Sequence, residues 1–167
     1  MVQIPAFETV AQAHGHTCPG IALGYKIAVV AARWVGDDDD VRIVAHTTRC
    51  PLDALKVTFD VRNHPERMVV EDTNTVSFVI TKPNGKKLFI DELPGTHLTT
   101  DELTEIKKKV EAGTATPDDL RRMNEIKNEL FRIMQAIPDE KLFAVREESL
   151  RPNDIYFTSQ PPCEIEL

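Results

Sequence analysis

Hydrophobic residues near the start of the chain recur at the spacing of helices. The pattern predicts one helix over Pro5–His14, which Gly15 ends. A second, strongly apolar helix is expected from Ile21 to about Val35, with Gly36 closing it. Because the second helix is apolar on nearly all sides, we expect it to be buried against a sheet or a partner subunit.

Short apolar segments predict several strands, and Val41–His46 alternates between apolar and polar residues as a strand does. One is expected over Val41–His46, and a last one over Lys141–Arg146. Between them, the segments Thr75–Thr81 and Lys86–Glu92 flank Pro83-Asn84-Gly85, and an Asn-Gly pair between apolar runs strongly favours a hairpin. Helices and strands are mixed without regular βαβ alternation, so the predicted class is α+β, with helices packed on one face of a mixed sheet.

Two charged helices are expected within residues 98–138. Thr99 and Glu102 have the spacing of a capping box, and Thr116 precedes a second helix start. The second helix carries an apolar stripe that needs a covering surface, formed by Leu120, Met123, Leu130, Ile133, Met134 and Ile137. We interpret 98–138 as a helical hairpin, an insertion or subdomain, within one domain spanning residues 1–167.

Composition excludes several classes of protein. The chain has 167 residues and a net charge of −7, so overall charge does not favour binding to nucleic acid or to an anionic membrane surface. No apolar run approaches the roughly 20 residues of a membrane span, and no signal peptide is visible at the N-terminus. Three cysteines do not make a disulfide framework, which favours free thiols or metal ligands in a reducing cytoplasm. Lys107, Lys108 and Lys109 are interpreted as a solvated face among acidic residues.

The densest group of chemically reactive side chains is His14-Gly15-His16-Thr17-Cys18-Pro19-Gly20. A second Cys-Pro pair, Cys50-Pro51, also precedes a short predicted helix. If the two helix starts converge, His16, Cys18 and Cys50 form three ligands for zinc or another divalent transition metal. The fourth position is then open to water, a small anion or His14.

Simpler interpretations of the same residues remain open. His14 could pack on the first helix, His16 could be a surface residue, and both cysteines could be small buried side chains. Asp53, one turn after Cys50, could orient a ligand or be an acid favoured by the helix start.

Two stretches resemble the family named after FmdE, a component of formylmethanofuran dehydrogenase. Residues 13–26 are similar to its His-Gly-His-x-Cys-Pro-Gly-x-x-x-Gly signature, and residues 49–55 to its Arg-Cys-x-x-Asp-Ala motif. The resemblance covers roughly residues 5–93. It implies a helix–strand–helix–three-strand core, similar to the substrate-side domain of glyceraldehyde-3-phosphate dehydrogenases. It also implies a zinc site, which carries over to His16, Cys18 and Cys50, with His14 as a further ligand or an orienting group.

Two parts of the family pattern are missing. Residues 57–64 lack the Gly-Cys-Thr-x-Gly-Lys-Gly segment that often follows the second motif, and no C-terminal zinc ribbon is present, since only Cys163 remains there. His64 lies near the missing segment and is a candidate substitute ligand. His46 could face the same cleft, and His97 is interpreted as a loop residue.

Three functions are compatible with these observations. The first is a zinc-binding protein of the FmdE type, an enzyme or accessory subunit in anaerobic one-carbon or molybdenum-tungsten metabolism. The second is a non-catalytic module that carries metal or docks to a larger redox enzyme complex. The third is a thiol-redox protein in which Cys18 and Cys50 form a reversible disulfide. The apolar helix and its small residues, Gly24 and Ala28 among them, further predict a homodimer.

Overall fold

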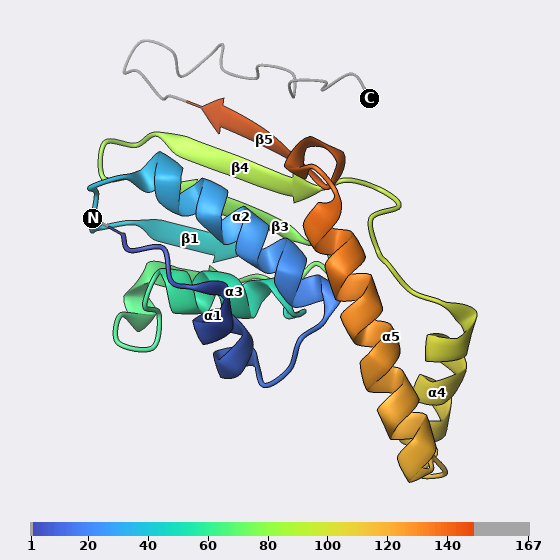
Figure 1. Ribbon diagram of the computed structural model, residues 1–167. Coiled ribbons are helices and arrows are strands. Elements are labelled where there is room, and N and C mark those ends of the chain that lie inside the picture. Colours follow the sequence, from blue (N-terminus) through green and yellow to red (C-terminus); the bar gives the residue numbers. More distant parts are fainter. Residues whose placement is uncertain (1, 149–167) are drawn as a thin grey trace.

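The computed structural model describes residues 2–148 (Figure 1), so Cys163 and the proline-rich tail lie outside the described residues. The elements, in chain order, are α1 (Phe7–His14), α2 (Pro19–Val35), β1 (Arg42–Ala45), α3 (Pro51–Thr58), β2 (Met68–Val70), β3 (Ser77–Thr81), β4 (Lys87–Glu92), α4 (Asp101–Glu111), α5 (Pro117–Ala136) and β5 (Phe143–Glu148). The helices and strands predicted from the sequence are all present, and most ends differ by only a few residues.

The strands form one five-stranded sheet in the order β2-β1-β3-β4-β5. β1 and β2 are parallel, whereas the pairs β1–β3, β3–β4 and β4–β5 are antiparallel. The sheet is therefore mixed, which confirms the α+β class. The order α2, β1, α3 and then β2–β4 also confirms the helix–strand–helix–three-strand core, to which α4, α5 and β5 are added.

Helix α2 lies across the sheet and is the centre of the core (Figure 1). Its Ile27 is fully buried, as are Phe78 and Ile80 on β3 and Ile90 on β4. Helices α3 and α5 also pack against α2. Much of the apolar surface of α2 is thus covered within one chain, so its burial does not require a partner subunit.

Two details of the charged hairpin differ from the prediction. Helix α4 is capped by Thr100, whose hydroxyl accepts from the amide of Leu103, and not by Thr99. In α5, Leu120 and Ile133 are 43% and 50% exposed, whereas Ile126, absent from the predicted stripe, is buried. Helix α5 buries a face that recurs every four residues, through Ile126 and Leu130 against α4 and through Met134 against the main core.

The hydrophobic pattern did not reveal β2, which has only three residues and lies at the edge of the sheet. Its Val69 and Val70 are exposed, so β2 has no buried apolar alternation to signal it. Among the helices in residues 2–148, none combines the length and the apolar character needed to cross a bilayer.

Candidate metal centre

Two cysteines stand at helix starts that lie next to each other. Cys18 is the N-cap of α2 and Cys50 the N-cap of α3, and in each helix the following residue is a proline. Proline suits the first helical position because the amide it lacks would have no partner there. The sulfur of Cys18 also accepts a hydrogen bond from the amide of Ile21, 3.4 Å away. The Cys18 sulfur therefore faces the partially positive start of α2, which favours its thiolate form, whereas the Cys50 side chain makes no such capping contact.

Glycines in α2 allow α3 to approach this closely. A Cβ atom on Gly24 would lie 2.5 Å from the Cα of Pro51, and one on Gly20 would lie 2.8 Å from the Cβ of Cys50. Real side chains do not tolerate such distances, so each position accepts only glycine with the helices in this arrangement. The spacing Gly20-x-x-x-Gly24 thus explains why Cys50 comes to rest beside Cys18.

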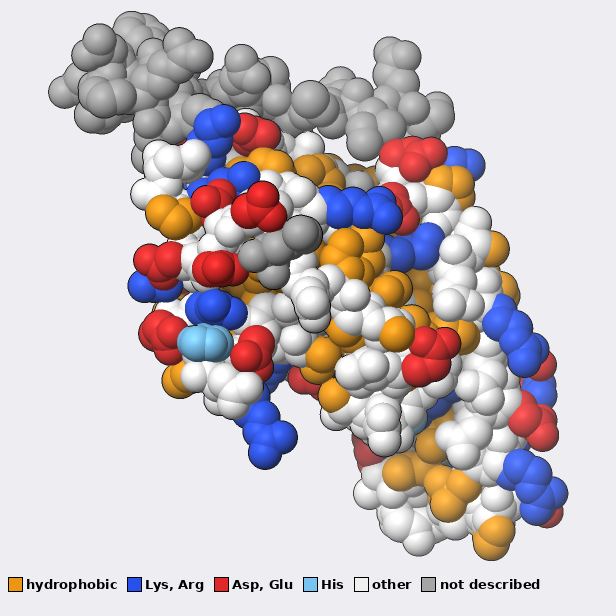
Figure 2. All heavy atoms as spheres, turned by 60° about the vertical axis from the view of Figure 1, so that its left-hand side comes forward, with side chains coloured by type: hydrophobic (Ala, Val, Ile, Leu, Met, Phe, Trp, Pro, Cys, Tyr) orange, Lys and Arg blue, Asp and Glu red, His pale blue; other side chains and the backbone are white. Residues whose placement is uncertain are grey.

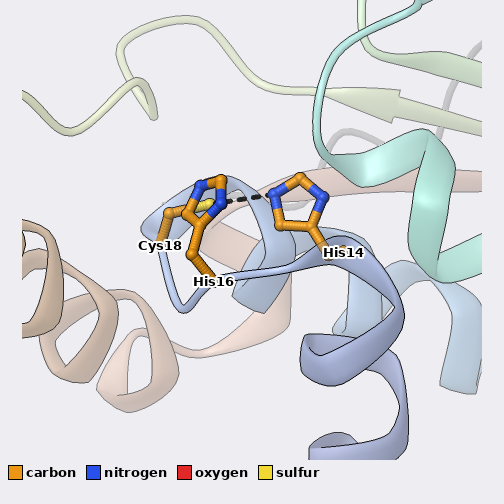
Figure 3. A group of neighbouring side chains, drawn as sticks. All are labelled: His14, His16 and Cys18. Carbon is orange, nitrogen blue, oxygen red and sulfur yellow. Dashed lines mark hydrogen bonds between the residues drawn. The ribbon is translucent and has the colours of Figure 1, made fainter.

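Both histidines of the first motif reach the same place. Helix α1 ends at His14, and Gly15, with a φ of 97°, turns the chain towards α2 in a conformation that other residues rarely adopt. One side-chain ligand atom from each of His14, His16 and Cys18 lies within 4.8 Å of the other two. Figure 3 shows the two imidazole rings beside the Cys18 sulfur, and the ring centroids are 4.4 Å apart.

His14 is held from behind by a carboxylate. Its Nδ1 lies 2.7 Å from Oδ2 of Asp53, and its Nε2 lies 3.6 Å from the Cys18 sulfur (Figure 3, dashed line). Because an ionised carboxylate only accepts hydrogen bonds, Nδ1 donates to Asp53, and Nε2 is the nitrogen that faces Cys18. A carboxylate that fixes the far nitrogen of a histidine is the usual support of a metal-binding imidazole.

The two thiols interact directly, which makes them unequal. The Cys50 thiol donates to the Cys18 sulfur, and this hydrogen bond lowers the pKa of Cys18 to about 6. The same contact, together with burial, raises the pKa of Cys50. Burial and the neighbouring His14 and Lys127 lower the pKa of His16, so its imidazole is neutral at pH 7. The Cys18 thiolate and the neutral His16 imidazole are therefore already in the protonation states that metal binding requires.

All four residues nominated as ligands are therefore neighbours. Cys50 is not part of the tight group of three, but it interacts with both Cys18 and His14. Two imidazole nitrogens and two sulfurs make a donor set that fits zinc and other borderline divalent metals.

The remaining histidines, His46, His64 and His97, do not belong to this group of four residues. His64 faces Asp60 and Glu66 beyond the far end of α3, and His46 bonds the carbonyl of Glu71, so the structure supports neither as a ligand. His97, interpreted as a loop residue, does lie in a loop, but it also lines a cavity that opens beside the cysteines.

That cavity has a volume of about 190 Å³, and two lysines that the sequence did not predict as site residues line it. They are Lys107, interpreted above as part of a solvated face, and Lys127. A signal was present for the first, because Lys107 follows the buried Leu103 by four residues and so lies on the same side of α4. Lys127 has no such signal, since the fold of α5 across the cavity decides its position.

The comparison with protein families agrees with the motifs. The family model described as "FmdE, Molybdenum formylmethanofuran dehydrogenase operon" matches residues 13–144. This range continues through the charged hairpin, well past the residues on which the resemblance rested. Among solved structures, the chain is similar to an FmdE-like protein of tungsten formylmethanofuran dehydrogenase from Syntrophus aciditrophicus. That similarity has a TM-score of 0.49 and 13% identity, and covers 87% of this chain and 71% of the other. No curated protein matches the chain.

Proposed function

The chain belongs to the FmdE family, and from this premise we propose that it is a metal-binding protein whose centre is formed by His14, His16, Cys18 and Cys50. Zinc is the metal that the donor set favours, with another divalent transition metal as the alternative. The observation that carries the proposal is the meeting of two helix-capping cysteines with a histidine already oriented by Asp53.

Each residue at the proposed centre has a separate role in binding the metal. Asp53 holds the proton of His14 on Nδ1, which leaves Nε2 directed at the ligand site. Cys18, with its pKa of about 6, supplies a thiolate at neutral pH, and Cys50 loses its proton only when the metal displaces it. His16 is exposed at the surface. A metal ion bound here would polarise a carbonyl or acidify a water molecule.

The adjoining cavity favours a metal site that acts on a bound molecule over a purely structural metal site. Its wall contains His16, Cys18 and Cys50, so a small molecule in the cavity would contact the centre directly. This supports an enzyme or an accessory subunit in anaerobic one-carbon or molybdenum-tungsten metabolism, in line with the family description. A module that carries metal, or that docks to a larger redox enzyme complex, is the non-catalytic form of the same proposal.

We further propose a cytoplasmic homodimer. Cys18 and Cys50 are free thiols, and a site that needs both as thiolates requires a reducing compartment. Exposed apolar side chains on the hairpin, including Leu120 and Ile133, provide surface that a second copy could cover.

A thiol-redox protein is the second candidate, and one observation favours it. The hydrogen bond between Cys50 and Cys18 places a lowered-pKa thiolate next to a resolving thiol. Formation of the disulfide from this thiolate and thiol would release one proton and pass two electrons to an oxidant, and reduction would reverse this.

Metal analysis of Cys18→Ser, with Cys163→Ser as the matched control, separates the candidates. The metal proposal predicts about one metal ion per chain in the wild type and in Cys163→Ser, and loss of stoichiometric metal in Cys18→Ser. Unchanged metal in Cys18→Ser would refute the proposed ligands. A metal-free wild type that forms a Cys18–Cys50 disulfide under mild oxidation would favour the redox candidate instead.

A further inference from the structure

The cavity beside the cysteines has two very different walls. One wall is the metal centre itself, through Cys18 and Cys50. The other is the charged hairpin, which contributes Leu103 and Lys107 from α4 and Lys127 and Met134 from α5. The hairpin is therefore not only an appendage of the sheet, because it forms the cavity wall that faces the centre.

Positive charge gathers on this cavity, although the protein as a whole is acidic with a net charge of −7. Arg49, Lys107 and Lys127 line it, and Glu92 is the acidic residue among its lining side chains. Glu92 already accepts a hydrogen bond from Thr96, with 2.7 Å between the two oxygens. Arg49 donates to Asn74. The two lysines are therefore the cations available to a bound molecule.

Most other cations of the hairpin are paired with acidic residues, whereas these two lysines are not. Lys108 pairs with Glu105, Lys109 with Asp119, and Arg122 with Glu102. Within residues 2–148, by contrast, neither Lys107 nor Lys127 forms an ion pair or a side-chain hydrogen bond. Lys127 is also half-buried. An anion in the cavity would give both ammonium groups a partner.

The rest of the lining is apolar and limits the size of the ligand. Leu98, Leu103 and Met134 provide a hydrophobic surface next to the lysines. The volume of about 190 Å³ lies below the range of roughly 300–1,000 Å³ that holds drug-sized molecules. The cavity therefore suits a small molecule with one anionic end and a short apolar chain.

We propose that this cavity binds a small monocarboxylate, with its carboxylate beside Lys127 and Lys107 and its alkyl chain against Leu98, Leu103 and Met134. The inference rests on the proposed function and deepens it, because it identifies small monocarboxylates as the class of molecule that binds next to the metal centre. The lysines and the apolar wall do not themselves depend on the metal, so the two proposals can fail separately.

Titration of the isotope-labelled, full-length protein by NMR tests the inference, with butyrate as the probe. Acetate, butyramide and inorganic phosphate are the comparison ligands. We expect butyrate to bind about tenfold more tightly than acetate, because two further methylene groups are buried. Butyramide, which has the same shape without the charge, should bind at least about tenfold more weakly than butyrate. Phosphate should not bind in preference to butyrate, since it cannot use the apolar wall.

Substitutions locate the binding. Lys127→Gln should weaken butyrate binding about tenfold, and Lys107→Gln should weaken it to a smaller extent. Lys108→Gln, which changes a paired lysine of the same hairpin outside the cavity, should leave it unchanged. Retained amide spectra in each variant show that the fold is intact.

The outcomes separate the inference from the proposed function. Three results would overturn the inference, even in a protein that holds a stoichiometric metal ion. Butyrate could fail to bind, it could bind no more tightly than butyramide, or its binding could be unaffected in both Lys127→Gln and Lys107→Gln. Tighter binding of phosphate would overturn the monocarboxylate assignment. Lysine-dependent butyrate binding to a protein that takes up no metal would uphold the inference and refute the proposed metal centre.

Discussion

Asp53 shows how one side chain can determine the state of another. Its carboxylate is 42% exposed, whereas the His14 side chain that it bonds is only 8% exposed. The pair therefore fixes both the orientation of the imidazole and the nitrogen that carries its proton. Sequence spacing left two roles open for Asp53, and only the fold of α1 against α3 decides between them.

Asp53→Asn should weaken metal binding by about 10- to 100-fold without changing the ligands themselves. An amide can still contact Nδ1, but it no longer favours the required tautomer by charge. Competition with a chromophoric chelator measures the affinity, and Asp118→Asn, at an exposed position of α5, is the control. Equal affinities in the two variants would show that Asp53 does not support a ligand.

The lowered pKa of Cys18 can be measured in the metal-free protein. The rate of alkylation of Cys18 by iodoacetamide, followed by peptide mass spectrometry, should rise with a midpoint near pH 6, because the Cys50 thiol stabilises the thiolate. An unperturbed cysteine has its midpoint at about 8.5. Removing the donor in Cys50→Ala should move the midpoint upwards. A wild-type midpoint near 8.5 would contradict the hydrogen bond between the thiols.

At the scale of whole elements, the contact between α2 and α3 creates the centre. Gly24 lies at the point of closest approach, where an added Cβ would meet the Pro51 backbone. Backbone atoms cannot move aside as a flexible side chain can. The separation of the two helices therefore decides whether Cys18 and Cys50 meet.

Gly24→Ala tests this contact, because the substitution can either raise or lower the free energy of unfolding. On an isolated helix the substitution would stabilise by about 1 kcal/mol, because alanine is the better helix former. Here we expect a lower free energy of unfolding, by about 1–3 kcal/mol, and weaker metal binding as α3 is displaced. Urea unfolding of the metal-free variant and metal analysis measure the two effects. A variant more stable than the wild type would show that the helices do not depend on this close approach.

Turns and helix ends could be predicted from the sequence, whereas features that depend on packing between distant segments could not. The hairpin at Pro83-Asn84-Gly85 and the caps at Gly15 and Gly36 were predicted correctly, because short-range backbone chemistry specifies them. The buried face of α5 was predicted only in part, since Ile126 and Ile133 are equally apolar and the placement of α4 decides which one is covered. The same limit applies to Lys127, whose position facing the cavity follows from packing between distant segments.

At the scale of the molecule, the hairpin of α4 and α5 extends away from the sheet (Figure 1). The lower right lobe of Figure 2 displays hydrophobic side chains among charged ones. On the hairpin, Val110, Leu120 and Ile133 are 43%, 43% and 50% exposed. A surface of this kind favours contact with a second copy.

Sedimentation at micromolar concentration should therefore return twice the chain mass of 18.8 kDa. Ile133→Glu should shift the protein towards the monomer, because a charge in an apolar interface is unfavourable. A wild-type mass near 18.8 kDa would refute the homodimer.

The most direct test of the metal centre is X-ray absorption spectroscopy of the freshly purified protein, combined with its metal content. We predict about one zinc ion, or one other divalent transition metal ion, per chain. For zinc, two sulfurs at about 2.3 Å and two nitrogens at about 2.0–2.1 Å are expected, matching Cys18, Cys50, His14 and His16. A protein without stoichiometric metal, or a bound metal with no sulfur in its coordination, would contradict the account.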